Sequence, residues 1–555
     1  MNDRAPRMHG KGELLFLPLG GSGEIGMNLN LYGYAGKWLM VDLGVTFGDE
    51  GVPGVDVITP DPAFIEEHRD DLVALVLTHA HEDHLGAVQY LWPRLRCPVY
   101  ATAFTASVLR RKLQDSNLLA QVPITEIPLS GRFRVEPFDI ELIRLTHSIP
   151  EPNALAIRTP LGTVLHTGDW KLDPDPLVGE ATDEASLRAL SGEGVLALIG
   201  DSTNALRHGE SGSEGTVRKT LTELFGQYKG RIAVACFASN IARLESIAVA
   251  AAAHDRHVAL VGRSLWRMNE AARENGYLKD IPDFLDETQI GFVPRDKVVM
   301  ICTGSQGEPR AALARIASDG HPHVVLEKGD VVIFSSRVIP GNERAVHNIW
   351  NGLLHQGIEV VTDETHPGVH VSGHPARDEL TQMYQWVRPK IAVPVHGEPQ
   401  HLRAHAELAR MCQVPHTIVP ENGELIRLAP GPAEIIDHVT AGRLAVDGER
   451  LLPIDGTVIR GRTRLLWNGV LIATVVVDRK GRLATDPQIA APGLIDPEAD
   501  DEFLTEIDDA IRDAVSESGR KPDEQLREEV RRRVRRLVKE RTDKKPTVEI
   551  HLVRL

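Results

Sequence analysis

Seven consecutive residues, Thr78 to His84, hold three histidines and two carboxylates in the order Thr-His-Ala-His-Glu-Asp-His. The apolar run 72–77 before them is typical of a strand buried on both faces, and residues 85–91 after them favour a helix. Side chains on so tight a loop converge on one point, and imidazole with carboxylate suits zinc, manganese or iron. The segment therefore predicts a metal site, with an ordinary polar surface loop as the alternative.

Three further strand ends carry groups that complete such a site. His147 follows the strand-like residues 140–143, and Asp169 and His396 each follow another apolar run. Taken singly, the two histidines can equally be hydrogen-bonded core residues, and the aspartate can be a turn carboxylate. Their shared position after apolar strands favours one common site.

The pattern His-x-His-x-Asp-His, followed by separate His, Asp and His, resembles the metallo-β-lactamase fold. That fold layers two β-sheets between helices and holds two metals at one edge. The resemblance implies that the first metal takes three imidazoles, from His79, His81 and His147. It implies that the second takes one carboxylate and two imidazoles, from Asp83, His84 and His396. Asp169 bridges the two metals, and Asp42 forms hydrogen bonds behind the ligands.

Two divalent ions in one site favour hydrolysis. Ions about 3.5–4 Å apart activate water at neutral pH and neutralise the oxygens of a phosphodiester. We expect Zn²⁺, with Mn²⁺ as the alternative, because mixed histidine and carboxylate ligands accept both. The glycine-rich residues 20–26 lack the lysine of a nucleotide-binding loop, so we expect no nucleotide cofactor.

The segment between Asp169 and His396 is too long for a loop. Apolar strand-like runs alternate there with helical segments, which predicts a parallel α/β sheet in a domain inserted into the first. The clearest runs are residues 231–236, 257–261, 297–302 and 330–334.

Polar motifs beside and within this insert resemble those of the β-CASP nucleases, the nucleic-acid branch of the metallo-β-lactamase superfamily. They are residues 198–204, 237–241, 303–308 and 370–374. In that branch the aspartate matching Asp201 supports the histidine matching His374, a candidate general acid beside the scissile phosphate. Taken alone, Asp201 can equally be a helix N-cap or part of an Asx-turn.

Along nearly the whole chain, including residues 18–28, the motifs are similar to those of the ribonuclease J family. The resemblance implies a pocket for the 5′-monophosphate of RNA, formed by Ser239, His370, Ser372 and Gly373. Ordinary capping and turn chemistry is the alternative for these residues. The chain departs from the family at Ala242, where many members carry histidine, and Arg243 follows it.

The leading hypothesis is a metal-dependent ribonuclease acting in RNA maturation and decay, including rRNA processing and mRNA decay. The resemblance implies 5′-to-3′ exonuclease activity with preference for 5′-monophosphate ends, together with endonuclease activity. Its predicted catalytic residues are Asp83, Asp201 and His374. The alternatives are a small-substrate metallo-hydrolase, such as a lactonase or thioesterase, and an inactive RNA-binding scaffold. The long insert speaks against the first alternative, and the complete ligand set speaks against the second.

These observations predict an α/β protein: a metallo-β-lactamase αββα sandwich, an inserted β-CASP parallel α/β domain and a small α+β C-terminal domain. We expect the first domain over 1–210 with its completion over 373–455, the insert over 211–372 and the C-terminal domain over 456–555. In that last domain an acidic helix around 500–509 precedes a basic helix around 531–541. Ion pairing between them is the simpler interpretation, and RNA contact is the alternative. The resemblance implies a homodimer or homotetramer through this domain.

The net charge of −16 speaks against non-specific coating of RNA but does not exclude a narrow channel in which basic groups are concentrated. Four widely separated cysteines indicate a reducing compartment, not a disulfide framework. The sequence shows neither a signal-peptide core nor a run long enough to cross a membrane. We therefore expect a cytoplasmic protein that acts on RNA and not at a membrane.

Overall fold

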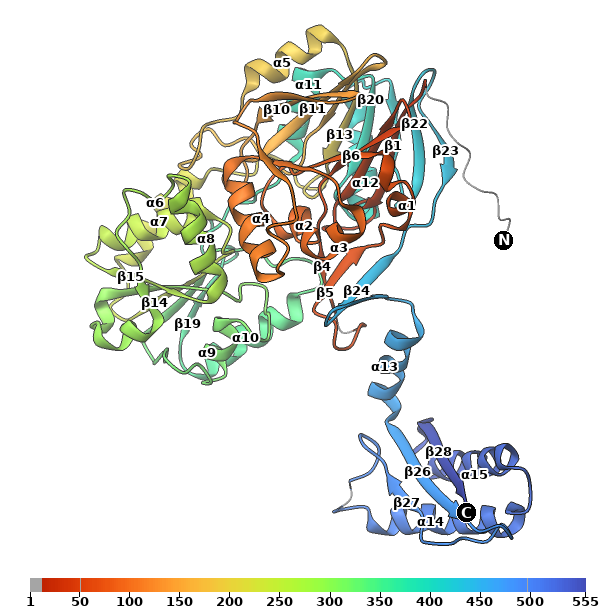
Figure 1. Ribbon diagram of the computed structural model, residues 1–555. Coiled ribbons are helices and arrows are strands. Elements are labelled where there is room, and N and C mark those ends of the chain that lie inside the picture. Colours follow the sequence, from red (N-terminus) through yellow and green to blue (C-terminus); the bar gives the residue numbers. More distant parts are fainter. Residues whose placement is uncertain (1–11, 50, 497) are drawn as a thin grey trace. The chain divides into compact units, whose positions relative to one another are not determined.

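The computed structural model describes residues 12–49, 51–496 and 498–555 (Figure 1). These residues form two compact units. The first contains the described chain up to Thr46 together with Thr59–Ala441, and the second contains the described parts of Phe47–Ile58 and Gly442–Leu555. All the predicted site residues lie in the first unit. The finer domain boundaries expected from the sequence stay a prediction.

Two mixed β-sheets form the framework of the first unit. The eight-stranded sheet has the order β23-β22-β1-β2-β3-β6-β7-β8, with β1 Leu14–Gly20, β2 Leu29–Tyr34, β3 Lys37–Val41, β6 Leu72–Val76, β7 Val99–Ala101, β8 Ile124–Glu126, β22 Glu424–Ala429 and β23 Glu434–His438. The seven-stranded sheet has the order β21-β20-β13-β12-β11-β10-β9, with β9 Arg132–Val135, β10 Phe138–Arg144, β11 Asn153–Thr159, β12 Gly162–His166, β13 Val195–Asp201, β20 Ile391–Val395 and β21 His416–Thr417.

Apolar side chains from the two sheets meet in one core. Phe16 and Val41 of the eight-stranded sheet belong to the same buried cluster as Leu142, Ile199 and Val393 of the seven-stranded sheet. Each is almost fully removed from solvent. The two sheets therefore pack face to face across an apolar layer, which is the main source of stability for such a sandwich.

Helices cover the outer faces of these sheets, which confirms the predicted αββα sandwich. On the seven-stranded sheet, Leu187, Leu380 and Leu408 from three helices pack with Leu165 and Leu198 of the strands. The helices of this part are α1 Ala63–Glu67, α2 Glu82–Leu85, α3 Val88–Leu95, α4 Ala103–Asp115, α5 Glu184–Glu193, α11 Arg377–Val387 and α12 Pro399–Met411.

A third sheet in the first unit is parallel throughout, which confirms the predicted insert. Its order is β16-β15-β17-β14-β18-β19, with β14 Ile232–Ala235, β15 His257–Val261, β16 Leu285–Asp286, β17 Val298–Cys302, β18 Val331–Phe334 and β19 Glu359–Val361. Its central strands are continuous apolar runs because both faces are covered. The accompanying helices are α6 Glu214–Phe225, α7 Ile241–Ala252, α8 Arg263–Glu274, α9 Ala312–Ala317 and α10 Glu343–His355.

The second unit contains a small α+β module. Its three-stranded sheet, of order β27-β26-β28, packs against two helices through one apolar cluster. The elements are β26 Val470–Val477, β27 Gln488–Ala490, β28 Thr547–Arg554, α14 Asp501–Ser518 and α15 Asp523–Thr542. A four-stranded sheet precedes it, with β4 Thr46–Phe47, β5 Val57–Pro60, β24 Arg443–Asp447 and β25 Arg450–Pro453. The helices α14 and α15 match the acidic and basic helices that the sequence predicts, whereas the sequence pattern does not predict helix α13 Thr457–Asn468, which precedes β26.

Arginines of α15 form ion pairs with carboxylates of α14, which confirms the simpler interpretation of the two charged helices. Arg541 Nη2 lies 3.2 Å from Glu506 Oε1, and Arg533 pairs with Glu517. These pairs are exposed, so each contributes little to the free energy of folding. They nevertheless occupy part of the basic surface that RNA contact requires.

All four cysteines are free thiols, as the sequence predicts. Burial raises the pKa of Cys97 and of Cys236 to about 12, so these thiols stay protonated at neutral pH. In the described parts of the chain, every helix is too short or too polar to span a lipid bilayer.

Candidate metal centre

The seven predicted metal ligands lie shortly after strands of the two facing sheets. Strands β12, β13 and β20 are parallel neighbours, so Asp169, Asp201 and His396, at or just after their ends, lie at one edge of the sheet. His147 follows β10 in the same sheet, and the Thr78–His84 run follows β6 in the other. The short sequence motifs thus converge because the strands before them are aligned.

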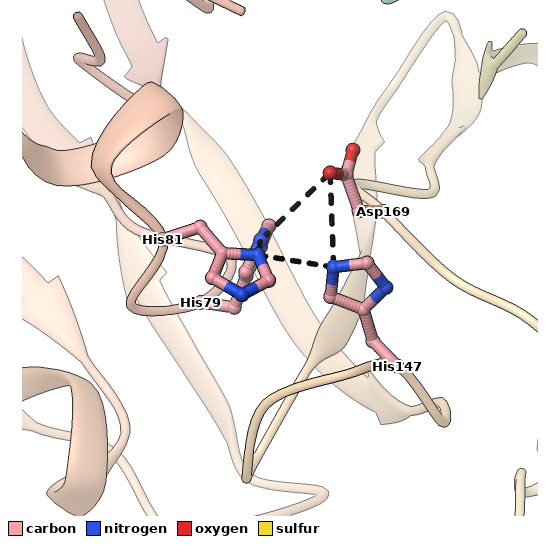
Figure 2. A group of neighbouring side chains, drawn as sticks. All are labelled: His79, His81, His147 and Asp169. Atoms are coloured by element: carbon pink, nitrogen blue, oxygen red, sulfur yellow. Dashed lines mark hydrogen bonds and ion pairs between the residues drawn. The ribbon is translucent and has the colours of Figure 1, made fainter. Parts of the chain in front are cut away.

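One group of ligand atoms comes from His79, His81, His147 and Asp169 (Figure 2). The Nδ1 atom of His81 lies 3.1 Å from His79 Nε2 and 3.0 Å from His147 Nε2. The Oδ2 atom of Asp169 lies 3.9 Å from the Nε2 atoms of His79 and His147. The structure therefore brings together the three imidazoles expected to hold the first metal.

A second group comes from Asp83, His84, His396 and again Asp169. Asp169 Oδ2 lies 3.2 Å from His84 Nε2, and Asp83 Oδ2 lies 3.1 Å from His396 Nε2. Asp169 belongs to both groups, which is the place expected of a bridging ligand. The roles of these side chains as metal ligands stay predictions.

Carboxylates and imidazoles in this centre control one another's protonation. Burial lowers the pKa of His81 to about 4 and holds that of His79 and His147 well below the ordinary value. Burial opposes a charge on His84 and His396 as well, but neighbouring carboxylates, Asp169 foremost, outweigh it and raise both pKa values. A divalent cation held by the second group would therefore take the place of these protons.

Asp169 and Asp83 remain ionised despite their burial. Desolvation opposes the charge of Asp169, but His396 and His84 hold its pKa well below the ordinary value. Burial also opposes the charge of Asp83, and His84 and His396 lower its pKa in the same way. The centre thus combines ionised carboxylates with the neutral imidazoles of His79, His81 and His147, which is a donor set for a divalent metal.

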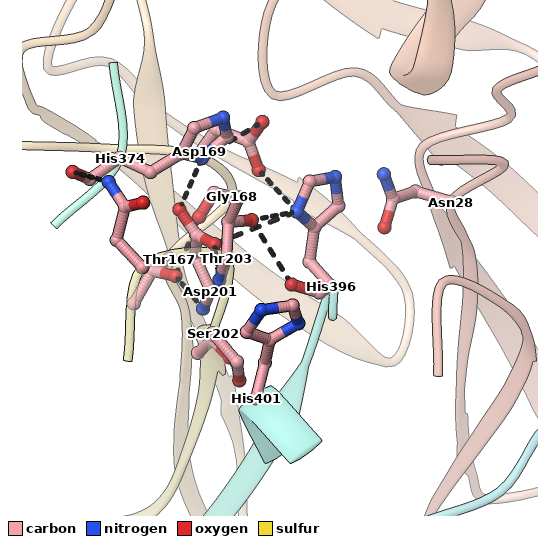
Figure 3. A network of polar contacts seen from close by, with 12 residues as sticks. Asn28, Thr167, Gly168, Asp169, Asp201, Ser202, Thr203, His374, His396 and His401 are labelled. Atoms are coloured by element: carbon pink, nitrogen blue, oxygen red, sulfur yellow. Dashed lines mark hydrogen bonds and ion pairs between the residues drawn. The ribbon is translucent and has the colours of Figure 1, made fainter. Parts of the chain in front are cut away.

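Four of the histidines are oriented by contacts of their outer ring nitrogens. His84 Nδ1 lies 2.7 Å from Asp42 Oδ2, and His396 Nδ1 lies 2.7 Å from Thr203 Oγ1 (Figure 3). The Nδ1 atom of His79 contacts Thr78 Oγ1 at 3.0 Å, and that of His147 contacts the carbonyl oxygen of Gly373. Each contact leaves Nε2 facing the centre, as metal-binding histidines require.

One buried carboxylate oxygen in the centre also fits a bound cation. Asp169 Oδ1 is buried and has no hydrogen-bond partner among the described residues. A buried carboxylate oxygen is costly to leave unsatisfied, and a metal ion satisfies it. Together with the inward Nε2 atoms, this oxygen fits the metals that the sequence predicts.

His374 stands beside this centre, held by Asp201 (Figure 3). Its Nδ1 lies 2.8 Å from Asp201 Oδ2 and 3.8 Å from Asp169 Oδ2. Burial opposes its charge, but Asp201 and Asp169 outweigh that effect and raise its pKa. An imidazole with a raised pKa keeps its proton near neutral pH, which suits a general acid.

Sequence reasoning missed two polar residues that orient this part of the centre. Thr203 holds His396, and Asn204 Nδ2 donates to Ser372 Oγ at 2.7 Å and to the carbonyl oxygen of His374 at 2.9 Å. Both follow Asp201 in the run Asp-Ser-Thr-Asn. The sequence signals them only as part of the motif 198–204, without a role for either side chain.

The predicted phosphate pocket is partly assembled around His374. The backbone N–H of His374 donates to Ser372 Oγ at 3.2 Å, and the carbonyl of Gly373 faces His147. His370 lies 3.4 Å from Arg243 Nη1, and Ser239 lies just before α7, the helix that carries Arg243. The structure thus joins Ser372 and Gly373 directly to the metal centre and connects His370 to the start of α7.

Arg243, which follows Ala242, is fully buried. Its Nη2 lies 2.8 Å from Glu214 Oε1, and its Nη1 donates to the carbonyl and hydroxyl oxygens of Ser335, both at 2.6 Å. The Arg243 guanidinium helps to hold the pKa of Glu214 below its ordinary value against the opposing effect of burial. These contacts use the charge of Arg243 inside the protein.

Breaking this buried pair from one side should be costly. We expect Glu214→Ala to reduce the free energy of unfolding by about 3–5 kcal/mol, because it leaves the buried Arg243 cation without a counter-ion. The double variant Glu214→Ala/Arg243→Met should lose less than the sum of the two single variants. Urea unfolding measures all four proteins, and additive losses would contradict a direct interaction.

Four models of known domains match the chain. They are the beta-lactamase superfamily domain over residues 53–193, the ribonuclease J beta-CASP domain over 229–353, the Zn-dependent metallo-hydrolase RNA specificity domain over 357–419 and the ribonuclease J C-terminal domain over 457–555. The matched regions follow one another along the chain in the order that the sequence motifs predict.

Relatives named ribonuclease J are similar over most of their length. The protein from Sinorhizobium meliloti is 50% identical over 88% of this chain and 87% of its own. The protein from Mycolicibacterium smegmatis is 43% identical over 88% of both chains, and that from Thermus thermophilus is 37% identical over 83% and 82%. The chain belongs to the ribonuclease J family. This membership confirms the resemblance predicted from the motifs.

A solved structure shares the fold of this member of the ribonuclease J family at much lower identity. It is a crystal structure of a protein of unknown function from Enterococcus faecalis, 17% identical, with a TM-score of 0.53. The match covers 75% of this chain and 100% of the other. At this identity the likeness concerns the fold alone.

Proposed function

We infer that this chain is a metal-dependent ribonuclease that hydrolyses the phosphodiester bonds of RNA. One observation carries the inference: two groups of histidines and carboxylates share Asp169 and lie beside the pair His374–Asp201. A shared carboxylate suits two divalent ions, and the adjacent imidazole suits proton transfer to a leaving oxygen. Membership of the ribonuclease J family supports RNA as the substrate.

We further propose that the enzyme holds two ions, with Zn²⁺ as the expected metal. His79, His81 and His147 would hold one ion, Asp83, His84 and His396 the other, and Asp169 both. When bound, such ions supply Lewis acidity that activates water and neutralises charge on the phosphate oxygens. The match with a Zn-dependent metallo-hydrolase model supports this choice of metal.

We propose 5′-to-3′ exonuclease activity with preference for a 5′-monophosphate, with endonucleolytic cleavage as a second activity. Ser372 and Gly373 directly precede His374 and contact the same loops. A terminal phosphate bound there lies close to the cleavage site, so that the first internucleotide bond reaches the centre. The hydroxyl of Ser372 and the imidazole of His370 would donate hydrogen bonds to its oxygens.

In this reaction the oxygen of water bonds to phosphorus while the bond from phosphorus to the 3′-oxygen of the terminal nucleotide breaks. His374 would give its proton to that 3′-oxygen, with Asp201 holding the imidazole through Nδ1. The released nucleotide keeps its own 5′-phosphate. The shortened RNA gains a new 5′-monophosphate, so each cut regenerates the end that the pocket recognises.

The 5′ end and the metal requirement can be tested together. RNA of one sequence is prepared with a 5′-monophosphate, a 5′-triphosphate or a 5′-hydroxyl and incubated with and without chelator. We expect mononucleotide release from the monophosphate RNA, lost with chelator and lowered more than about 100-fold in Asp83→Ala, which removes a ligand. Asp70→Ala, at a fully exposed side chain, is the matched control. Equal, slow turnover of all three RNAs, at a rate that the chelator does not change, would falsify the proposed function.

The phosphate pocket makes a separate prediction. Ser372→Ala removes one hydroxyl donor, so the preference for 5′-monophosphate over 5′-hydroxyl RNA should fall by about tenfold while internal cleavage changes less. Rates of end-dependent and internal cleavage are measured on linear and circular RNA. Ser318→Ala, at an exposed serine in the β-CASP part, is the control. A larger loss on circular RNA would rule out this role for Ser372.

We propose that the chain forms a homodimer or homotetramer through its C-terminal part. Helix α13 exposes large apolar side chains: Leu466 is 63% exposed and Trp467 is 71% exposed. Such side chains on one helix are typical of a protein interface. Sedimentation velocity should show an oligomer that shifts toward monomer in Leu466→Glu/Trp467→Glu, and a monomeric wild type at micromolar concentration contradicts the proposal.

A further inference from the structure

Ser202, His405 and Tyr384 form a buried chain of hydrogen bonds behind the candidate metal centre. Ser202 Oγ lies 2.8 Å from His405 Nδ1, and His405 Nε2 lies 2.8 Å from the hydroxyl of Tyr384. Ser202 and His405 are 0% exposed and Tyr384 is 3% exposed. None of the three faces the ligand atoms, and the proposed reaction does not use them.

The protons in this chain can be placed by counting donors. Burial lowers the pKa of His405 to about 4, so its ring is neutral at physiological pH and has one donor and one acceptor. Ser202 Oγ donates to the carbonyl oxygen of Gly200 at 3.4 Å, so it accepts from His405 Nδ1. His405 Nε2 then accepts from Tyr384. Every polar group in the chain has a partner and no net charge is buried, which makes such a chain stable and directional.

Ser202 stands between the two residues that orient the histidines of the centre. Asp201 on one side holds His374, and Thr203 on the other side holds His396 (Figure 3). Ser202 directly follows β13, where the chain enters a turn, and its hydroxyl contacts His405 and not the ligands. Its position thus determines where both partners lie.

The other two members lie on the helices that follow those same histidines. Tyr384 belongs to α11, which begins at Arg377, three residues after His374. His405 belongs to α12, which begins at Pro399, three residues after His396. The hydrogen-bond chain therefore connects the segment around Ser202 with α11 and α12 on the side away from the metal centre. On the side of the centre, Asp201 and Thr203 connect the same segment with the residues that lead into these two helices.

We propose that Ser202, His405 and Tyr384 are positioning residues that keep Asp201 and Thr203 in register with His374 and His396. They would act by fixing the general acid and one metal ligand to within the few tenths of an ångström that catalysis tolerates. Being neutral, the chain adds no charge that competes with Asp201 for His374. The expected effect on kcat rests on the proposed function, but the expected effect on zinc retention does not.

The test uses Tyr384→Phe, Ser202→Ala and their double variant in the full-length chain. Each change removes one hydroxyl, and we expect kcat on 5′-monophosphate RNA to fall about 10- to 100-fold with KM changed less than about twofold. Zinc retained after dialysis against a chelator should fall in parallel, because His396 is less well held. The double variant should lose about as much as the more damaging single variant, since both break one chain.

Tyr228→Phe is the matched control, because it removes a tyrosine hydroxyl that lies 2.7 Å from Glu359 in the β-CASP part. Its kcat and zinc retention should equal those of the wild type. Thermal unfolding of every variant separates positioning from general stability. The proposal is overturned if Tyr384→Phe and Ser202→Ala lower the melting temperature but leave kcat and zinc retention unchanged, or if their effects are additive.

The readouts also distinguish failure of this proposal from failure of the proposed function. If the wild type releases no nucleotide, the ribonuclease assignment fails, and zinc retention in the variants still tests the chain. If Tyr384→Phe does not fold, Ser202→Ala alone decides the outcome through kcat and zinc retention.

Discussion

The buried carboxylate of Asp169 is the interaction on which the rest of the centre depends. It is 3% exposed, and an ionised group in that environment is stable only with close partners. Nitrogens of His79, His84, His147 and His374 all lie within 3.9 Å of its Oδ2. These histidines come from both sheets and from the return of the chain after the insert, so satisfying Asp169 requires the whole catalytic unit to be assembled.

Around this carboxylate the contacts form successive layers. The inner ring nitrogens face Asp169, and the outer nitrogens of His84 and His396 contact Asp42 and Thr203. Behind Thr203, the neutral chain through Ser202 reaches helices α11 and α12. The carboxylates and imidazoles thus lie at the centre, and the hydrogen-bonded chain behind them adds no competing charge.

The ligand types, the insert and the family could be predicted because they depend on local pattern. The His and Asp residues follow apolar strands within a few positions, and strand alternation identifies the parallel sheet. Other features could not. Helix α13 carries exposed Leu466 and Trp467 and lacks a buried face with regular spacing, and the pairing of Arg243 with Glu214 depends on how α6 and α7 pack. Family membership also makes the lactonase and thioesterase alternatives unnecessary.

The sequence by itself determined which atoms are available for chemistry and that each stands at the end of a strand, because backbone alternation and loop position are short-range properties. Only the tertiary structure decided which of them meet. Asp201 and His374 are 173 positions apart, and Ser202 and His405 are 203 apart. Their contacts exist because β13 lies beside β20 in the sheet and the inserted domain returns the chain to that edge. Strand order over such separations depends on the packing of the whole core, and a short stretch of sequence does not specify that packing.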